Sequence, residues 1–117
     1  MMLLTAEIKK NLPALYTNED KSTAETMVVL KFFTPDSNWT WYVTEGSQVD
    51  ADGYYDTDKP KVDWMFFGLV DGSEKELGYF ALSELMSIRG RFGLPVERDR
   101  HFTPITLEAL KERLGDE

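Results

Sequence analysis

The stretch from Lys31 to Glu45 constrains the fold more than any other part of the chain. It reads K-F-F-T-P-D-S-N-W-T-W-Y-V-T-E. Two runs of β-branched and aromatic residues flank a Pro-Asp-Ser-Asn turn, which is the pattern of two strands joined by a turn. In the second run, strict alternation places Trp39 and Trp41 on one face of a strand and Tyr42 on the other. Three large aromatic side chains within four residues mark the centre of a folded domain.

The remaining elements follow from periodicity and from capping residues. Strands are expected at residues 27–33, 39–45, 64–70 and 77–81. Helices are expected at residues 5–12, 83–90 and 106–115, with Thr5, Ser83 and Thr106 as N-caps. This order favours an α+β fold, with an antiparallel sheet of about four strands and the helices packed on one face. The 117 residues are expected to form one domain, residues 1–117.

Composition restricts the classes of partner. The chain has 21 acidic and 13 basic residues, a formal net charge of -8, and no cysteine. Binding to a phosphate backbone needs clustered Lys and Arg, so we expect no binding to duplex DNA. The apolar patch at the amino terminus is too short for a signal peptide. The sequence has no run of eighteen apolar residues, the length that a membrane-spanning helix needs. A cytoplasmic protein with no membrane contact, no cofactor and no metal is expected.

The acidic residues cluster in the first half of the chain. No Lys or Arg occurs between residues 32 and 58, where the six acids are Asp36, Glu45, Asp50, Asp52, Asp56 and Asp58. The run beginning at Asp50 suggests a calcium loop at first sight. An EF-hand loop needs Gly at its sixth position and Glu at its twelfth, and here those positions hold Tyr55 and Lys61. We therefore interpret residues 46–61 as a solvated acidic loop.

Four of the five arginines fall in one segment of the second half: Arg89, Arg91, Arg98 and Arg100. These side chains could bind a phosphate or the carboxylates of a partner, or they could pair internally with the acidic half. The single histidine, His101, follows Asp99 in the same segment. No motif for a nucleophile, a phosphate-binding loop or a metal pair accompanies it, so catalytic residues stay unknown. Alternating charges here are also typical of a solvated edge strand.

The aromatic residues of the central hairpin also have two interpretations. They could stack on the bases of a single-stranded nucleic acid, but that mode needs basic residues among the rings, and the neighbouring charges are Asp36 and Glu45. Burial in the core is favoured for at least one tryptophan, and an exposed aromatic would suit a protein partner. The candidate binding residues are Trp39, Trp41, Tyr42, Glu45, Arg89, Arg91, Arg98, Asp99, Arg100 and His101.

Several of these segments together resemble a known family, domain of unknown function 2958. They are L-L-T at residues 3–5, L-P-A-L-Y at 12–16, the hairpin sequence at 31–45, F-G-L-V-D-G at 67–72, E-L-G-Y-F-A-L-S-E-L at 76–85 and R-G-R-F-G-L-P-V-E-R-D-R-H-F at 89–102. The resemblance covers residues 3–103 and implies no particular reaction. It implies a small cytoplasmic protein of plasmids, conjugative elements or phages, or a module of a larger protein from such elements. The loop at residues 50–61 lies outside the family pattern.

Three functional hypotheses follow. The first is a non-enzymatic accessory protein of a mobile genetic element that binds another protein, in its sharper form an acidic inhibitor or nucleic-acid mimic acting against a host defence system. The second is a small enzyme that acts on a phosphorylated substrate through His101 with Asp99, Arg98 or Arg100. The third is a module that binds single-stranded nucleic acid through Trp39, Trp41 and Arg89.

Overall fold

The computed structural model describes residues 2–115 and shows an α+β fold. The main sheet has five antiparallel strands in the order β5-β4-β3-β2-β6. Its strands are β2 Leu30–Phe33, β3 Thr40–Val49, β4 Asp63–Asp71, β5 Lys75–Ala81 and β6 Glu97–Arg98. A two-stranded ribbon pairs β1 Met27–Val28 with β7 Ile105–Thr106. The helices are α1 Ala6–Asn11, α2 Leu82–Ser87 and α3 Leu107–Arg113.

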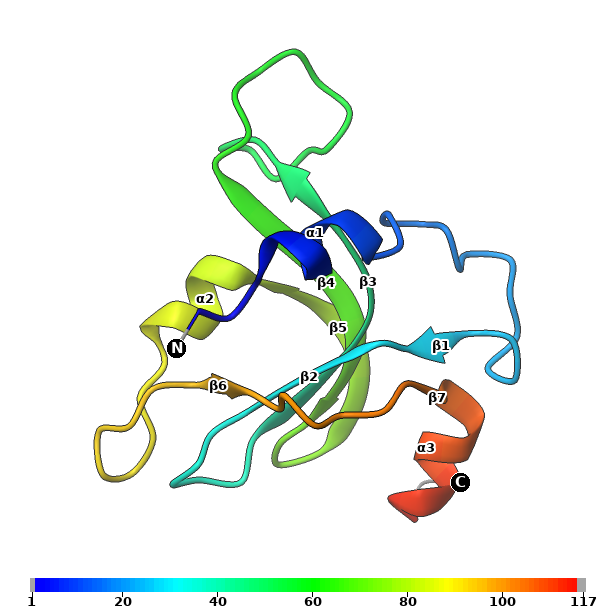
Figure 1. The fold of residues 1–117 in the computed structure, drawn as a ribbon, viewed down its shortest axis with the longest axis vertical. Coiled ribbons are helices and arrows are strands. Elements are labelled where there is room, and N and C mark those ends of the chain that lie inside the picture. The colour runs from blue at the N-terminus through cyan, green and yellow to red at the C-terminus, as the bar shows by residue number, and fades with distance from the viewer. Residues whose placement is uncertain (1, 116–117) are drawn as a thin grey trace.

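Both expected hairpins are present. Strands β2 and β3 pair around the Pro-Asp-Ser-Asn turn, and β4 and β5 pair around residues 72–74. Figure 1 shows β3 and β4 rising together above the rest of the molecule, with the loop of residues 50–62 at the top. The sheet has one strand more than the four expected, because residues 97–98 of the arginine segment pair with β2.

The helices do not pack on one face, contrary to expectation. Leu85 of α2 packs in a buried cluster with Trp41, and Ile8 of α1 packs against the same cluster. Leu110 of α3 packs with Tyr42 in a second cluster. Because Trp41 and Tyr42 are neighbours in β3, their side chains point to opposite faces of the sheet. Strand β3 presents a large aromatic side chain to each face of the sheet, so helices pack on both faces to bury them.

A β-bulge interrupts the alternation of β3. Val43 pairs with Gly68 and Glu45 pairs with Phe67, so Thr44 is one residue more than the partner strand has. An extra residue turns all later side chains of a strand to the other face. Strict alternation would place Glu45 beside Trp41 in the apolar cluster. The bulge instead places it on the opposite face, beside Phe67.

Two further expectations are corrected. Residues 27–33 form two short strands in different sheets, with a break at Val29, where the chain passes from β1 to β2. Thr5 and Thr106 cap their helices as expected, but Ser83 does not cap α2. Its hydroxyl bonds to the carboxylate of Asp63 instead, and Glu84 accepts a hydrogen bond from the backbone N–H that precedes α2. The local sequence predicts that a helix begins here. The contact of Ser83 with Asp63 of β4 leaves Glu84 as the side chain that accepts the hydrogen bond at the start of α2.

Candidate functional site

A hollow of about 340 Å³ lies on the face of the sheet that carries Phe67, beyond the part covered by α3. It is lined by residues of three strands, by the segment between α1 and β1, and by Leu107 at the start of α3. We define the tyrosine groove as the five residues that form its base and outer wall: Tyr16, Glu45, Phe67, Leu77 and Tyr79. Phe67 and Tyr79 are cross-strand partners in β4 and β5, so their rings share one face of the sheet.

Tyr16 reaches the groove because its segment is fixed to the second half of β3. The carbonyl of Pro13 accepts a hydrogen bond from the N–H of Gly46 at 2.8 Å, and the N–H of Leu15 donates to the hydroxyl of Ser47 at 2.9 Å. Tyr16 has a backbone φ of 72°, in the left-handed region that costs a non-glycine residue about 1–2 kcal/mol. Non-glycine residues held in this backbone conformation cluster at functional sites.

Glu45 lies at the base of the groove and is only 4% exposed. Its Oε2 atom accepts a hydrogen bond from the backbone N–H of Tyr16. The bulge residue beside it, Thr44, is also buried and donates its hydroxyl to the carbonyl of Phe67 at 3.0 Å. Asn18 donates its side-chain amide to the carbonyl of Thr44 at 3.4 Å. These bonds fix the carboxylate on the groove face.

The aromatic rings of the groove contact one another. The ring centroids of Phe67 and Tyr79 lie 4.9 Å apart in an edge-on arrangement, and those of Tyr16 and Tyr79 lie 6.5 Å apart. A side-chain hydrogen bond with Tyr16 raises the pKa of Tyr79, with smaller contributions from burial and from the charges of Glu45 and Glu19. The charges of Glu45 and Glu19 thus place the phenol of Tyr79 in a negative potential, which favours its protonated form.

The acidic loop extends this surface. The ring of Tyr55 lies 5.7 Å from that of Tyr16, and a second hollow of about 250 Å³ between the loop and the sheet is lined by Tyr16, Tyr54, Tyr55 and Tyr79 among others. Because both hollows share Tyr16 and Tyr79, the loop and the groove form one tyrosine-rich surface.

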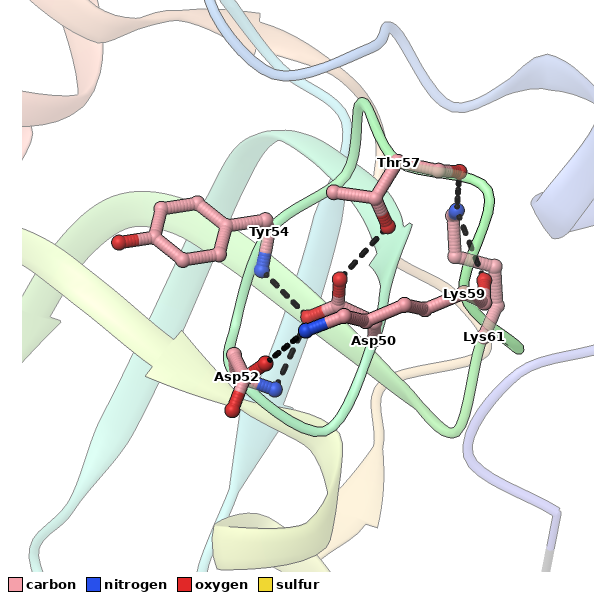
Figure 2. A network of polar contacts seen from close by, with 6 residues as sticks. All are labelled: Asp50, Asp52, Tyr54, Thr57, Lys59 and Lys61. Carbon is pink, nitrogen blue, oxygen red and sulfur yellow. Dashed lines mark hydrogen bonds and ion pairs between the residues drawn. The ribbon is translucent and has the colours of Figure 1, made fainter.

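The loop is held by a buried carboxylate rather than solvated throughout. Asp50 is 2% exposed and accepts hydrogen bonds from the backbone N–H groups of Asp52 and Tyr54 and from the hydroxyl of Thr57 (Figure 2). Figure 2 also shows Lys59 reaching the Asp52 carboxylate, at 2.7 Å. The expectation of a solvated acidic loop over residues 46–61 is thus wrong for Asp50 and for residues 46–49, which belong to β3. The sequence did not show that one aspartate organises the turn that presents Tyr54 and Tyr55.

The tryptophans and Tyr42 of the hairpin do not form an open platform. Trp41 and Tyr42 are 5% and 7% exposed and belong to opposite core clusters. Trp39 is exposed, stacks on Trp41 with ring centroids 6.1 Å apart, and lies over Gly72 in the next hairpin. The three aromatic residues therefore present one partly exposed ring, and Glu45 lies elsewhere in the tyrosine groove.

The arginine segment separates into residues with different environments. Arg98 donates to the carbonyls of Met2 and Leu3, at 2.7 and 3.1 Å, and so fixes the amino-terminal segment to β6. Arg89 donates to two carbonyls at the end of α2. Arg91 and Arg100 are exposed. The structure does not bring the four arginines together into one site.

His101 is exposed beside two shallow hollows that share Lys31, Asp99 and His101, of about 370 and 420 Å³. Arg98 and Arg100 both line the first hollow, so it brings together four of the candidate residues, Arg98, Asp99, Arg100 and His101, whereas Arg113 lines the second. Asp99 accepts from the backbone N–H of His101 through one oxygen and faces Lys31 at 3.7 Å through the other. It therefore does not orient the imidazole ring, as the carboxylate of a catalytic pair would.

Neither a metal cluster nor a membrane span is found in the part of the chain that the structure describes. Within residues 2–115, no group of three or more His, Asp or Glu side chains is placed to hold a metal ion. None of the helices in this range is long and apolar enough to cross a bilayer.

Residues 3–110 match the model of the family described as a protein of unknown function (DUF2958). The chain belongs to the DUF2958 family. The comparisons with curated proteins and with solved structures found no match. The match extends seven residues beyond the region of resemblance expected from the motifs, to include most of α3.

Sequence reasoning placed only Glu45 of this DUF2958 groove among the candidates. It missed the other four, although all five groove residues belong to segments that carry the family resemblance: Tyr16, Glu45, Phe67, Leu77 and Tyr79. The sequence of β5 contains a pattern that could have indicated the groove residues, because Leu77 and Tyr79 alternate with Gly78 and Phe80. Such alternation predicts one face of aromatic and aliphatic side chains in addition to the face that contributes to the core.

Proposed function

We propose that this DUF2958 chain is a non-enzymatic accessory protein of a mobile genetic element, and that it binds another protein through the tyrosine groove. The observation that carries this proposal is the exposure of the tyrosines. Tyr16, Tyr55 and Tyr79 are 45%, 44% and 54% exposed although their rings contact one another. A contiguous exposed aromatic surface of this kind is typical of an interaction site.

Tyrosine suits this role on physical grounds. Its large ring contributes contact area at a small cost in side-chain entropy, and its hydroxyl satisfies a partner's polar groups. Leu77, 45% exposed, adds an aliphatic contact beside Tyr79 on β5. β5 is the last strand of the sheet order, so an extended segment of a partner has access to its outer edge as well as to this face.

The chemistry of the groove favours binding over catalysis. The buried carboxylate of the groove, Glu45, is fixed by the backbone of Tyr16, and the contacts of Tyr79 raise its pKa and so favour the protonated phenol. A protonated phenol is a hydrogen-bond donor and a poor general base. The net charge of -8 favours a basic protein surface as the partner and disfavours nucleic acid.

Affinity capture with the tagged full-length chain tests this proposal. We expect Tyr79→Ala to lose the captured partner, with at least a tenfold loss of affinity when the partner is purified. Phe92→Ala is the matched control, because Phe92 is an exposed aromatic residue, 79% exposed, in the loop after α2. Capture of the same partner by Tyr79→Ala, or no protein enriched by the wild-type chain over this variant, would contradict the proposal.

A further inference from the structure

Within residues 2–115, the carboxylate at the base of the tyrosine groove accepts one hydrogen bond, through one of its two oxygens. Oε2 of Glu45 accepts from the N–H of Tyr16. Among residues 2–115, no Lys, Arg or His nitrogen lies within 4 Å of this carboxylate. The ion pairs found in this range join Lys31 to Asp99 and Lys59 to Asp52. Carboxylates that are this deeply buried are normally paired with a cation. The second oxygen of Glu45 thus leaves a place for a cationic ligand.

The surroundings of the carboxylate select a particular kind of cation. The walls are formed by the rings of Phe67 and Tyr79, by Tyr16 and by Leu77. Aromatic faces attract a cation through their quadrupole, and arginine makes this contact more often than lysine. A guanidinium is planar, is more weakly hydrated than an ammonium, and stacks on an aromatic ring while it donates to a carboxylate. Lysine lacks the planar group that such walls accommodate.

The size and the potential of the groove agree with a single side chain. About 340 Å³ is at the lower end of the range for small-molecule sites, which is about 300–1,000 Å³. The negative charges of Glu45 and Glu19 act at the hydroxyl of Tyr79 and contribute to its raised pKa. Lys21 lines the mouth of the same hollow, but it forms no ion pair with Glu45.

We propose that the tyrosine groove binds an arginine side chain of the partner protein, with its guanidinium on the free oxygen of Glu45 and its plane against the rings of Tyr79 and Phe67. This inference rests on the proposed function, because it specifies what the groove recognises in a protein partner. The acidic carboxylate supplies the charge, and the aromatic walls supply the preference for arginine over lysine.

NMR titration of the full-length chain with capped arginine, N-acetyl-arginine methylamide, tests the inference. We expect saturable shifts at millimolar concentration in the backbone signals of Tyr16, Glu45, Phe67 and Tyr79. Capped citrulline is the matched neutral probe, because its ureido group has the shape of guanidinium without the charge. Its affinity should be at least tenfold weaker, and that of capped lysine should be weaker than that of arginine. Sodium chloride at equal concentration controls for ionic strength.

Two variants locate the site. Glu45→Gln should weaken the binding of capped arginine at least tenfold, and Asp52→Asn should leave it unchanged, because Asp52 is exposed in the acidic loop. Shifts that do not saturate, equal affinity for citrulline, tighter binding of lysine, or unchanged affinity of Glu45→Gln would each overturn the inference. If Glu45→Gln does not fold, the comparison of arginine with citrulline on the wild-type chain decides.

The outcome is separable from that of the proposed function. If capped arginine does not bind but Tyr79→Ala still loses the captured partner, the protein-binding function stands and the arginine assignment is wrong. If arginine binds in the groove but capture does not depend on Tyr79, the groove is a guanidinium site and the proposed function is wrong.

Discussion

The backbone N–H of Tyr16 donates a hydrogen bond to the side chain of Glu45, 29 positions further along the chain. This bond joins a residue in the left-handed region to the residue that follows a β-bulge. Each of the two irregularities places a side chain in the tyrosine groove. Because each supports the other, a change at either residue is expected to affect both the fold and the groove.

Glu45→Ala should lower the free energy of unfolding by about 1–3 kcal/mol, because the N–H of Tyr16 loses its acceptor in a part-buried position. Urea denaturation measures the loss. Glu76→Ala is the control, since Glu76 is an exposed acid on β5 and its removal should change stability by less than about 0.5 kcal/mol. Similar effects of the two substitutions would show that the carboxylate of Glu45 does not support the segment of Tyr16.

Gly68→Ala and Gly78→Ala should differ sharply, although the two glycines are cross-strand partners. A Cβ at Gly68 would lie 1.8 Å from the carbonyl oxygen of Tyr42, whereas a Cβ at Gly78 meets nothing within 4 Å. The backbone of the central strand cannot rotate away, so Gly68→Ala should cost about 3 kcal/mol or more. Gly78→Ala should be neutral or slightly stabilising. Equal thermal midpoints for the two variants would contradict the pairing of β3 with β4.

Asp50 should contribute to stability in a pH-dependent way. Its hydrogen bond with Thr57, followed by that from the backbone of Tyr54, lowers the pKa of Asp50. Since the folded chain favours the ionised form, the contribution is complete above the pKa of the unfolded chain, about 3.9, and is lost as the pH falls through the lower pKa of the folded chain.

Thermal unfolding of Asp50→Asn and the wild type between pH 3 and 7 checks this prediction. The difference between their midpoints should be constant above about pH 5 and should shrink below about pH 4. Asp52→Asn should show a smaller difference throughout, because its ion pair with Lys59 is solvent-exposed. A difference for Asp50→Asn that grows as the pH falls would mean that the sign of the pKa shift is wrong.

Arg98→Ala should destabilise the fold and Arg100→Ala should not. Arg98 makes two charge-assisted hydrogen bonds to the carbonyls of Met2 and Leu3, and Leu3 is part of the core, so we expect a loss of about 1–3 kcal/mol. Arg100 is exposed, and its truncation should stay within about 0.5 kcal/mol. Chemical denaturation of both variants gives the comparison. If Arg98→Ala leaves the free energy of unfolding unchanged, Arg98 is again a candidate for partner recognition.

The sequence predicted the elements whose cause is local. The turn after Phe33 and the capping threonines Thr5 and Thr106 act within a few residues, and the structure places them as expected. The opposite orientation of Trp41 and Tyr42 followed from the two-residue period of a strand. Family membership was also evident from the motifs and is confirmed over residues 3–110.

Tertiary structure alone decided the site. Alternation could not show that Thr44 is an extra residue, because a bulge depends on the pairing of β3 with β4 rather than on the residues of one strand. The contact of Tyr16 with Tyr79 and Tyr55 needs the segment after α1, the acidic loop and β5 to be fixed on one sheet. Such contacts join residues far apart in the sequence. They are selected by the free energy of packing the whole chain, which no local pattern of residues records.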